Sequence, residues 1–168
     1  MATISKLNEI NGSGLVPSAR RSALAELPSV PAHVFPHRTP SQLLALARRG
    51  LEEAAEQPSD GLRYAGAHLA GLRAAAAVVA ARAKPVASRR SKLTSVWVLL
   101  SMIAPELSEW AAYFSASAGK RAAAEAGIPR VVTAREADDL VRAAASFVSV
   151  VELALGLQHP GLLDELVA

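Results

Sequence analysis

"TPSQLLALARRGLEEAAEQP", residues 39–58, has the features of a helix with a defined start, one apolar face and a defined end. Thr39 is a favourable N-cap residue, and Pro40 suits the first helical position because its missing N–H has no helical partner there. Leucine and alanine then recur at intervals of three and four residues, which places them on one helical face. Pro58 cannot continue the helix, so the stretch predicts a helix that buries one side.

The chain downstream predicts three further helical segments. The second begins at Ser59 and Asp60 and ends before Pro85, and the third runs over residues 94–126. The fourth begins at Thr133, because a threonine followed by glutamate three residues later forms a capping box. Short linkers rich in proline and glycine join the segments, so the expected fold is all-α, an antiparallel four-helix bundle.

Pro105 lies inside the third segment. A proline in a helix interior removes a backbone hydrogen bond and costs about 3 kcal/mol, so a helix bends or restarts there. The third helix is therefore expected to be broken or kinked at Pro105.

The composition favours one folded helical domain. Hydrophobic residues make up 51% and aromatic residues only 4% of 168 residues, so small apolar side chains dominate the expected core. The chain has no cysteine, which excludes disulfides, zinc–thiolate sites and thiol nucleophiles and fits a cytoplasmic protein. The most apolar stretch, residues 65–83, contains charged residues, so no membrane span is expected. A net charge of +3 permits nucleic-acid binding without requiring it.

Residues 1–38 contain several glycines and prolines that interrupt any helical periodicity. They predict a flexible N-terminal leader, or alternatively an arm whose apolar residues pack across the domain. The expected organisation is a leader over 1–38, a helical bundle over 39–157 and a short C-terminal turn or tail over 158–168.

The order and spacing of three longer stretches resemble a known family. "LLALARRGLEEAAEQPSDGLRYAGAHLAGLRAAAAVVAARAKP" is similar to the first two helices of a HEPN (higher eukaryotes and prokaryotes nucleotide-binding) domain. "SVWVLLSMIAPELSEWAAYFSASAGKRAAAEAG" and "VTAREADDLVRAAASFVSVVELALG" are similar to its third and fourth. Within them, "APELSEWAAYF" and "TAREADDLVRAAASFV" resemble an alanine-rich HEPN-type family of actinobacterial proteins. The resemblance covers residues 39–157.

This resemblance implies a four-helix bundle that commonly forms a homodimer. Some HEPN proteins are ribonucleases, others are partners of nucleotidyltransferases, and others are non-catalytic binding modules. In the active members, an arginine followed after four to six residues by a histidine lies at the start of the last helix. Two copies of this motif meet across the dimer and act on the RNA 2′-hydroxyl and phosphate. Here Arg135 and Arg142 lie in the last helix, and no histidine follows either at that spacing.

The chain contains one arginine and histidine at this spacing, Arg63 and His68, but they fall on the second helix. Histidine is a general base near neutral pH, and arginine stabilises negative charge, so the two are candidate catalytic residues. Five positions along a helix correspond to about 140° around its axis, so the two side chains do not share a face. We therefore favour a structural histidine and a surface arginine.

Five basic residues without an intervening acid form a candidate nucleic-acid-binding segment. They are Arg82, Lys84, Arg89, Arg90 and Lys92. No aromatic residue for stacking bases lies among them, so a solvated linker between helices is the favoured interpretation.

Four aromatic residues are candidates for a partner or dimer interface, although core packing is the favoured interpretation. They are Trp97, Trp110, Tyr113 and Phe114. The alanine-rich second helix is a further candidate for a dimer contact. His33 and His37 lie in a proline-rich segment without a nearby carboxylate, so we expect neither a metal site nor a cofactor.

Three functional hypotheses follow. The favoured one is a non-catalytic HEPN-type binding module, expected as a homodimer, that associates with RNA, a nucleotide or a protein partner. The second is a metal-independent HEPN ribonuclease with a displaced active site. The third is a helical adaptor that docks on a larger complex through its N-terminal leader.

Overall fold

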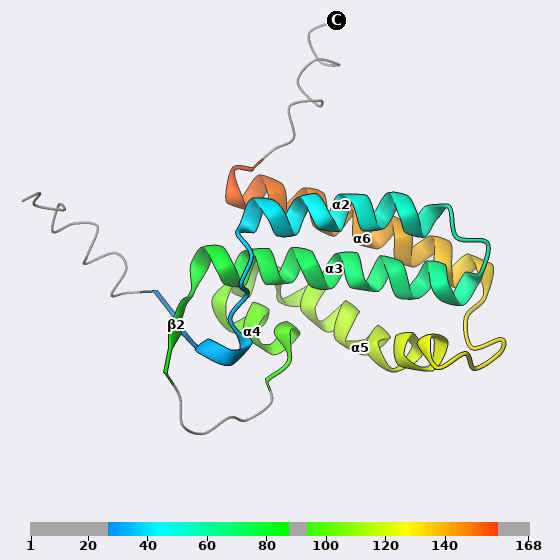
Figure 1. The fold of residues 1–168 in the computed structure, drawn as a ribbon, viewed down its shortest axis with the longest axis horizontal. Helices are drawn as coiled ribbons and strands as arrows, with labels where there is room; N and C mark the ends of the chain where they lie inside the picture. The colour runs from blue at the N-terminus through cyan, green and yellow to red at the C-terminus, as the bar shows by residue number, and fades with distance from the viewer. Residues whose placement is uncertain (1–26, 88–93, 158–168) are drawn as a thin grey trace, which may run out of the picture.

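A computed structural model describes residues 27–87 and 94–157 of the chain (Figure 1). Five α-helices lie in these ranges: α2 (Pro40–Ala55), α3 (Asp60–Arg82), α4 (Val96–Ile103), α5 (Ser108–Glu125) and α6 (Ala134–Leu155). They also contain two 3₁₀ helices, η1 (Ala32–Val34) and η2 (Pro105–Leu107), and two short strands, β1 (Ser29–Pro31) and β2 (Lys84–Val86). The predicted helical fold is confirmed, and the small sheet was not predicted.

The alanine-rich helix α3 lies at the centre of the fold. It packs against α2, α4, α5 and α6, and α2, α3, α5 and α6 run in alternating directions in Figure 1. Five of its alanines are fully buried: Ala67, Ala70, Ala74, Ala75 and Ala77. Side chains this small let neighbouring helices approach closely, and a Cβ placed on Gly66 would lie only 2.9 Å from the Cβ of Ala54 in α2.

Helix α3 also has the length and mean hydropathy, 1.2, of a membrane-spanning helix. However, 61% of its most apolar window is buried inside the fold. A high hydropathy combined with this degree of burial is typical of a core helix that is covered on several sides. The predicted dimer contact through this helix stays a prediction, and the four helices that pack against α3 leave only part of its surface for such a contact.

The helix boundaries follow the local chemistry of their caps. Thr39 and Thr133 form capping boxes with Gln42 and Glu136, each satisfying backbone N–H groups that have no partner within the helix. The ion pair with Lys120 and the bonds from Thr133 lower the pKa of Glu136 to about 2, so this cap is ionised at neutral pH. Gly156 adopts a left-handed conformation with φ of 65° and ends α6.

Pro105 divides the third segment, as predicted. α4 ends at Ile103, and Ala104 leaves the helical conformation with φ of −133° and ψ of 77°. Pro105 then opens η2, which leads directly into α5. The break gives α4 and α5 different directions, so both can pack against α3.

The structure differs from the predicted leader over residues 27–38. β1 pairs in parallel with β2, and the amide of Lys84 donates a hydrogen bond to the carbonyl of Pro28 at 2.9 Å. Val30 is buried in a second, smaller core with Val79 and Leu99. This segment is an arm across the C-terminal end of α3, which was the alternative interpretation. Residues 1–26 and 158–168, with most of the predicted leader and tail, lie outside the described residues.

The large side chains of the main core come mostly from the helices around α3. Phe114 of α5 and Phe147 of α6 are fully buried, with ring centroids 5.4 Å apart. Phe114 lies directly over Gly71 of α3, where an added Cβ would meet its ring at 2.7 Å. The absence of a side chain at Gly71 therefore makes room for the aromatic core.

A pair of glycine substitutions tests this packing. We expect Gly71→Ala to lower the free energy of unfolding by about 1 kcal/mol or more, because overpacking outweighs the improved helix propensity. Gly119→Ala is the control, because Gly119 lies inside α5 with no atom near its added Cβ. The control should gain about 0.5 to 1 kcal/mol in urea unfolding. Equal gains at both positions would contradict the close contact between Gly71 and Phe114.

Candidate functional site

His68 lies in the core, between α3, α4 and α5. Its side chain is 0% exposed, and Nε2 lies 3.0 Å from the carbonyl oxygen of Phe114. The ring meets those of Trp97 and Phe114 edge-on, at centroid distances of 5.6 and 5.8 Å. A neutral imidazole with its proton on Nε2 donates to this carbonyl, whereas Nδ1 is buried without a hydrogen-bond partner.

Burial is the largest influence on the protonation of His68. Removal from water lowers its pKa below the usual value of 6.5, and the positive charge of Arg121 acts in the same direction. The hydrogen bond to Phe114 and the negative charge of Glu125 oppose this shift without cancelling it. His68 is therefore neutral at physiological pH and has the environment of a structural core residue.

Arg63 has a different set of partners. Its guanidinium forms an ion pair with Asp60 at 2.6 Å and donates to the carbonyl of Gln57 at 2.8 Å. Nε lies 3.0 Å from a carboxylate oxygen of Asp138 in α6, an ion pair without hydrogen-bond geometry. Arg63 thus fastens the start of α3 to the preceding loop and to α6, whereas His68 faces α4 and α5. The structure does not bring the two candidate catalytic residues together.

The structure describes only two of the five residues of the predicted basic segment, Arg82 and Lys84. Arg82 forms an ion pair with Glu106 of η2 and donates to the carbonyl of Ala154 at 3.3 Å, so it joins α3 to two other elements. The bond from Arg82 lowers the pKa of Glu106, so the pair stays ionised. Lys84 lies in β2. The remaining candidates, Arg89, Arg90 and Lys92, lie outside the described residues.

The four aromatic candidates divide between core and surface. Trp97 and Phe114 are buried and stack on one another at 5.1 Å, so they are core residues of this chain. Trp110 is half-buried and stacks on Phe147. Tyr113 is 45% exposed and meets Phe114 edge-on. Tyr113 and Trp110 therefore present surface for the predicted interface, and Trp97 lines a depression between α4 and α5.

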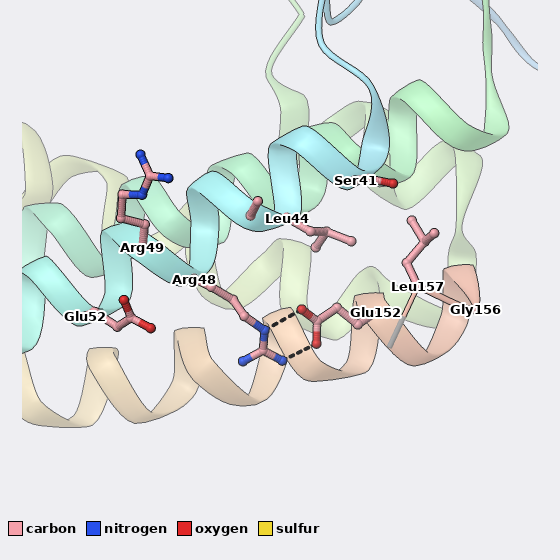
Figure 2. Close-up of a pocket in the computed structure, with 9 residues that line it drawn as sticks. Ser41, Leu44, Arg48, Arg49, Glu52, Glu152, Gly156 and Leu157 are labelled. Carbon is pink, nitrogen blue, oxygen red and sulfur yellow. Dashed lines mark hydrogen bonds and ion pairs between the residues drawn. The ribbon is translucent and has the colours of Figure 1, made fainter. Parts of the chain in front are cut away.

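A cavity that was not predicted from the sequence lies between α2 and the C-terminal end of α6 (Figure 2). Its volume is about 560 Å³, which is within the range of small-molecule sites. Helix α2 contributes the greater part of its lining, and the C-terminal end of α6 contributes the rest.

An ion pair between Arg48 and Glu152 lies in the wall of this cavity. Nε of Arg48 is 2.5 Å from Oε1 of Glu152, and Nη2 donates to Oε2, so the contact is bidentate. The Glu152 side chain is only 6% exposed, whereas that of Arg48 is 32% exposed. A buried carboxylate requires such a partner because an unpaired buried charge is strongly unfavourable.

Each member of this pair has a weak signal in the sequence. In α6, Glu152 comes directly after the buried Val151. In α2, Arg48 comes directly after the buried Ala47. A charged residue beside an apolar stripe indicates that it needs a partner. The partner itself lies 104 residues away, so local patterns cannot identify it.

Among the residues that the structure describes, no three metal-binding side chains lie close enough to hold an ion. His33 and His37 therefore belong to no metal cluster in this part of the chain.

The geometry defines a mostly helical domain with a buried central helix, in which Arg63 and His68 do not meet. The family model of SAV_6107-like HEPN matches residues 54–152, more than half of the chain. The chain belongs to the HEPN domain superfamily, in agreement with the resemblance found in its sequence. The match begins at the end of α2, so it covers less than the predicted 39–157 and leaves out Arg48. No curated protein and no solved structure matches the chain.

The burial of His68 predicts a specific dependence of stability on pH. Because its pKa is below 6.5 in the folded chain, the unfolded chain binds a proton that the folded chain does not. The contribution of neutral His68 to the free energy of unfolding should be fully retained above pH 6.5. As the pH falls below 6.5, the free energy of unfolding should decrease by at most about 1.4 kcal/mol per pH unit because of this group. His68→Gln should remove that part of the slope in urea unfolding between pH 5 and 7.5.

His37→Gln is the control, because His37 is an exposed residue outside the core. It should keep the slope of the unsubstituted chain. An unchanged slope in His68→Gln would contradict the inferred neutral state of the buried imidazole.

Proposed function

We propose that this chain is a non-catalytic HEPN-type binding module. The observation that carries the proposal is the position of His68, whose side chain is 0% exposed and whose Nε2 is committed to the carbonyl of Phe114. A general base must reach the proton that it removes, directly or through one water molecule. RNA cannot reach His68 without opening the contact between α3, α4 and α5.

The last helix supports the same conclusion. Arg142 is exposed on α6 and pairs with Asp139, and Arg135 is exposed in its first turn. The residues that follow Arg142 are alanine, serine, phenylalanine and valine, none of which can act as a general base. Arginine alone stabilises charge but does not transfer the proton that cleavage of RNA requires.

We also propose a correspondence with the HEPN bundle. α2, α3 and α6 correspond to its first, second and fourth helices, and the α4–η2–α5 segment corresponds to a broken third helix. The alternating directions of α2, α3, α5 and α6 in Figure 1 support this correspondence.

The absence of cysteine from the chain fits a cytoplasmic location.

The partner that the described surface suits best is a protein, and the simplest one is a second copy of the chain. A depression of about 330 Å³ lies between α4 and α5, and no charged residue lines it. Met102 is 70% exposed at this depression, next to the exposed Val98, and small residues such as Ala112 and Ser115 form the opposite wall. An uncharged surface with both a projecting side chain and a hollow suits a symmetric contact, in which each copy supplies both.

Cleavage assays test the catalytic part of this proposal. The unsubstituted chain and His68→Gln are incubated with single-stranded and structured RNA, without metal, at matched concentrations of folded protein. Neither should release fragments, because His68 is buried and its Nε2 contacts the carbonyl of Phe114. Cleavage by the unsubstituted chain that falls about 10²-fold or more in His68→Gln would instead identify a ribonuclease.

Equilibrium sedimentation at micromolar concentration tests the proposed dimer. Met102→Glu should shift the chain from dimer to monomer, because it would bury an unpaired carboxylate in the uncharged hollow of the other copy. Leu153→Glu is the matched control, since Leu153 is similarly exposed but lies on α6 outside this depression. A monomeric unsubstituted chain, or equal effects of both substitutions, would contradict self-association through the α4–α5 surface.

A further inference from the structure

The cavity between α2 and α6 contains a guanidinium group that is held in a fixed orientation. Glu152 binds two of the nitrogens of Arg48, and its own side chain is nearly inaccessible to water. A long arginine side chain normally loses considerable rotamer freedom when it binds a ligand. For Arg48 this ordering has already occurred, because the ion pair with Glu152 is part of the folded chain.

Arg48 keeps donors for another molecule. A guanidinium carries five N–H groups, and the bidentate contact with Glu152 uses two of them, one on Nε and one on Nη2. Arg48 has no other hydrogen-bond acceptor or ion-pair partner among the described residues. Figure 2 shows Nη1 pointing away from Glu152, and the side chain is 32% exposed. The free edge of the fork matches the two oxygens of a planar carboxylate or those of a phosphate ester.

The rest of the cavity suits an apolar body of modest size. Leu44 and Ala45 line it from α2, and Leu157 lines it where the chain leaves α6. The hydroxyl of Ser41 is its polar group at the N-terminal end of α2. A volume of about 560 Å³ accommodates a small organic molecule but not a folded domain.

The charges around the cavity decide which anions fit. Two arginines, Arg48 and Arg49, and two glutamates, Glu52 and Glu152, line it, so the positive and negative charges balance. A single negative charge finds the free donors of Arg48. Further negative charges on a polyphosphate would face Glu52 and Glu152, with only Arg49 left in the lining to offset them.

We propose that the cavity between α2 and α6 binds a small amphipathic monoanion, whose oxyanion head contacts Arg48 and whose apolar body lies against Leu44 and Leu157. This assignment goes beyond the proposed non-catalytic role and uses none of the residues on which that role depends. If the chain cleaved RNA or were monomeric, the proposed function would fail, but the proposal of a ligand site at Arg48 would not be affected.

Hexanoate is a suitable probe because it has one carboxylate and a short apolar chain. In ¹H–¹⁵N NMR titrations of the full chain, hexanoate should give saturable shifts confined to residues 41–52 and 152–157. 1-Hexanol has a similar body without charge, and it should bind at least about tenfold more weakly. Tripolyphosphate should also bind more weakly than hexanoate, whereas hexyl methyl phosphate, a phosphodiester monoanion, distinguishes a phosphate head from a carboxylate head.

Substitutions on α2 locate the site. Ala45 lines the cavity and is exposed, so Ala45→Trp fills the space without disturbing the ion pair. It should weaken hexanoate binding by about tenfold or more, and Ala55→Trp, at an exposed position of α2 outside the cavity, should leave it unchanged. Arg48→Lys keeps a positive charge opposite Glu152 but removes the forked donors, so it should also lose about tenfold.

Three results would overturn the proposal. They are the absence of saturable shifts with hexanoate, equal binding of hexanoate and 1-hexanol, and binding that Ala45→Trp and Arg48→Lys leave unchanged. The NMR spectrum of each variant shows directly whether it is folded, so a loss of binding through unfolding is recognised. If one of the two variants, Arg48→Lys or Ala45→Trp, loses the native spectrum, its binding result is set aside and the other variant decides the test.

Discussion

The close packing around α3 is the constraint on which the rest of this structure depends. All four other α-helices in the described part of the chain contact this one helix, so the greater part of its apolar surface is covered. Alanine and glycine meet that requirement because they let a neighbouring backbone approach without a gap. However, alanine and glycine bury little apolar area per residue. The surrounding helices supply the larger buried side chains, which include Phe114, Phe147, Leu100 and Leu140.

The same constraint decides what polar residues on α3 can do. A helix that is covered on several sides gives each polar side chain a different neighbour, according to its angle around the axis. Arg63 meets carboxylates at the start of α3 and on α6, whereas His68 meets a carbonyl of α5. Two residues whose spacing suggests a catalytic motif are therefore separated by packing. The motif has no functional meaning without a surface on which both residues are presented together, and this supports the binding role that we propose.

Features that depend on local chemistry could be predicted from the sequence, and those that depend on distant partners could not. Thr39, Thr133 and Pro105 act on backbone groups within a few residues, so the helix starts and the break in the third helix were predicted correctly. The strands β1 and β2 have three residues each and contain prolines, so neither has the alternating pattern that identifies a strand. The Arg48–Glu152 pair, and with it the cavity, joins segments 104 residues apart.

The ion pair of Arg48 and Glu152 is not explained by stability alone. Replacement of a buried ion pair by apolar residues is often neutral or stabilising, so leucine pairs would join α2 and α6 equally well. A fixed guanidinium with free donors offers what leucine cannot, which is recognition of an oxyanion at a position set by the fold. In Figure 1 α2 lies on one side of α3, whereas α4 and α5 lie on the other. The two linings share no residue, so a ligand held at Arg48 leaves the α4–α5 surface open to a protein partner.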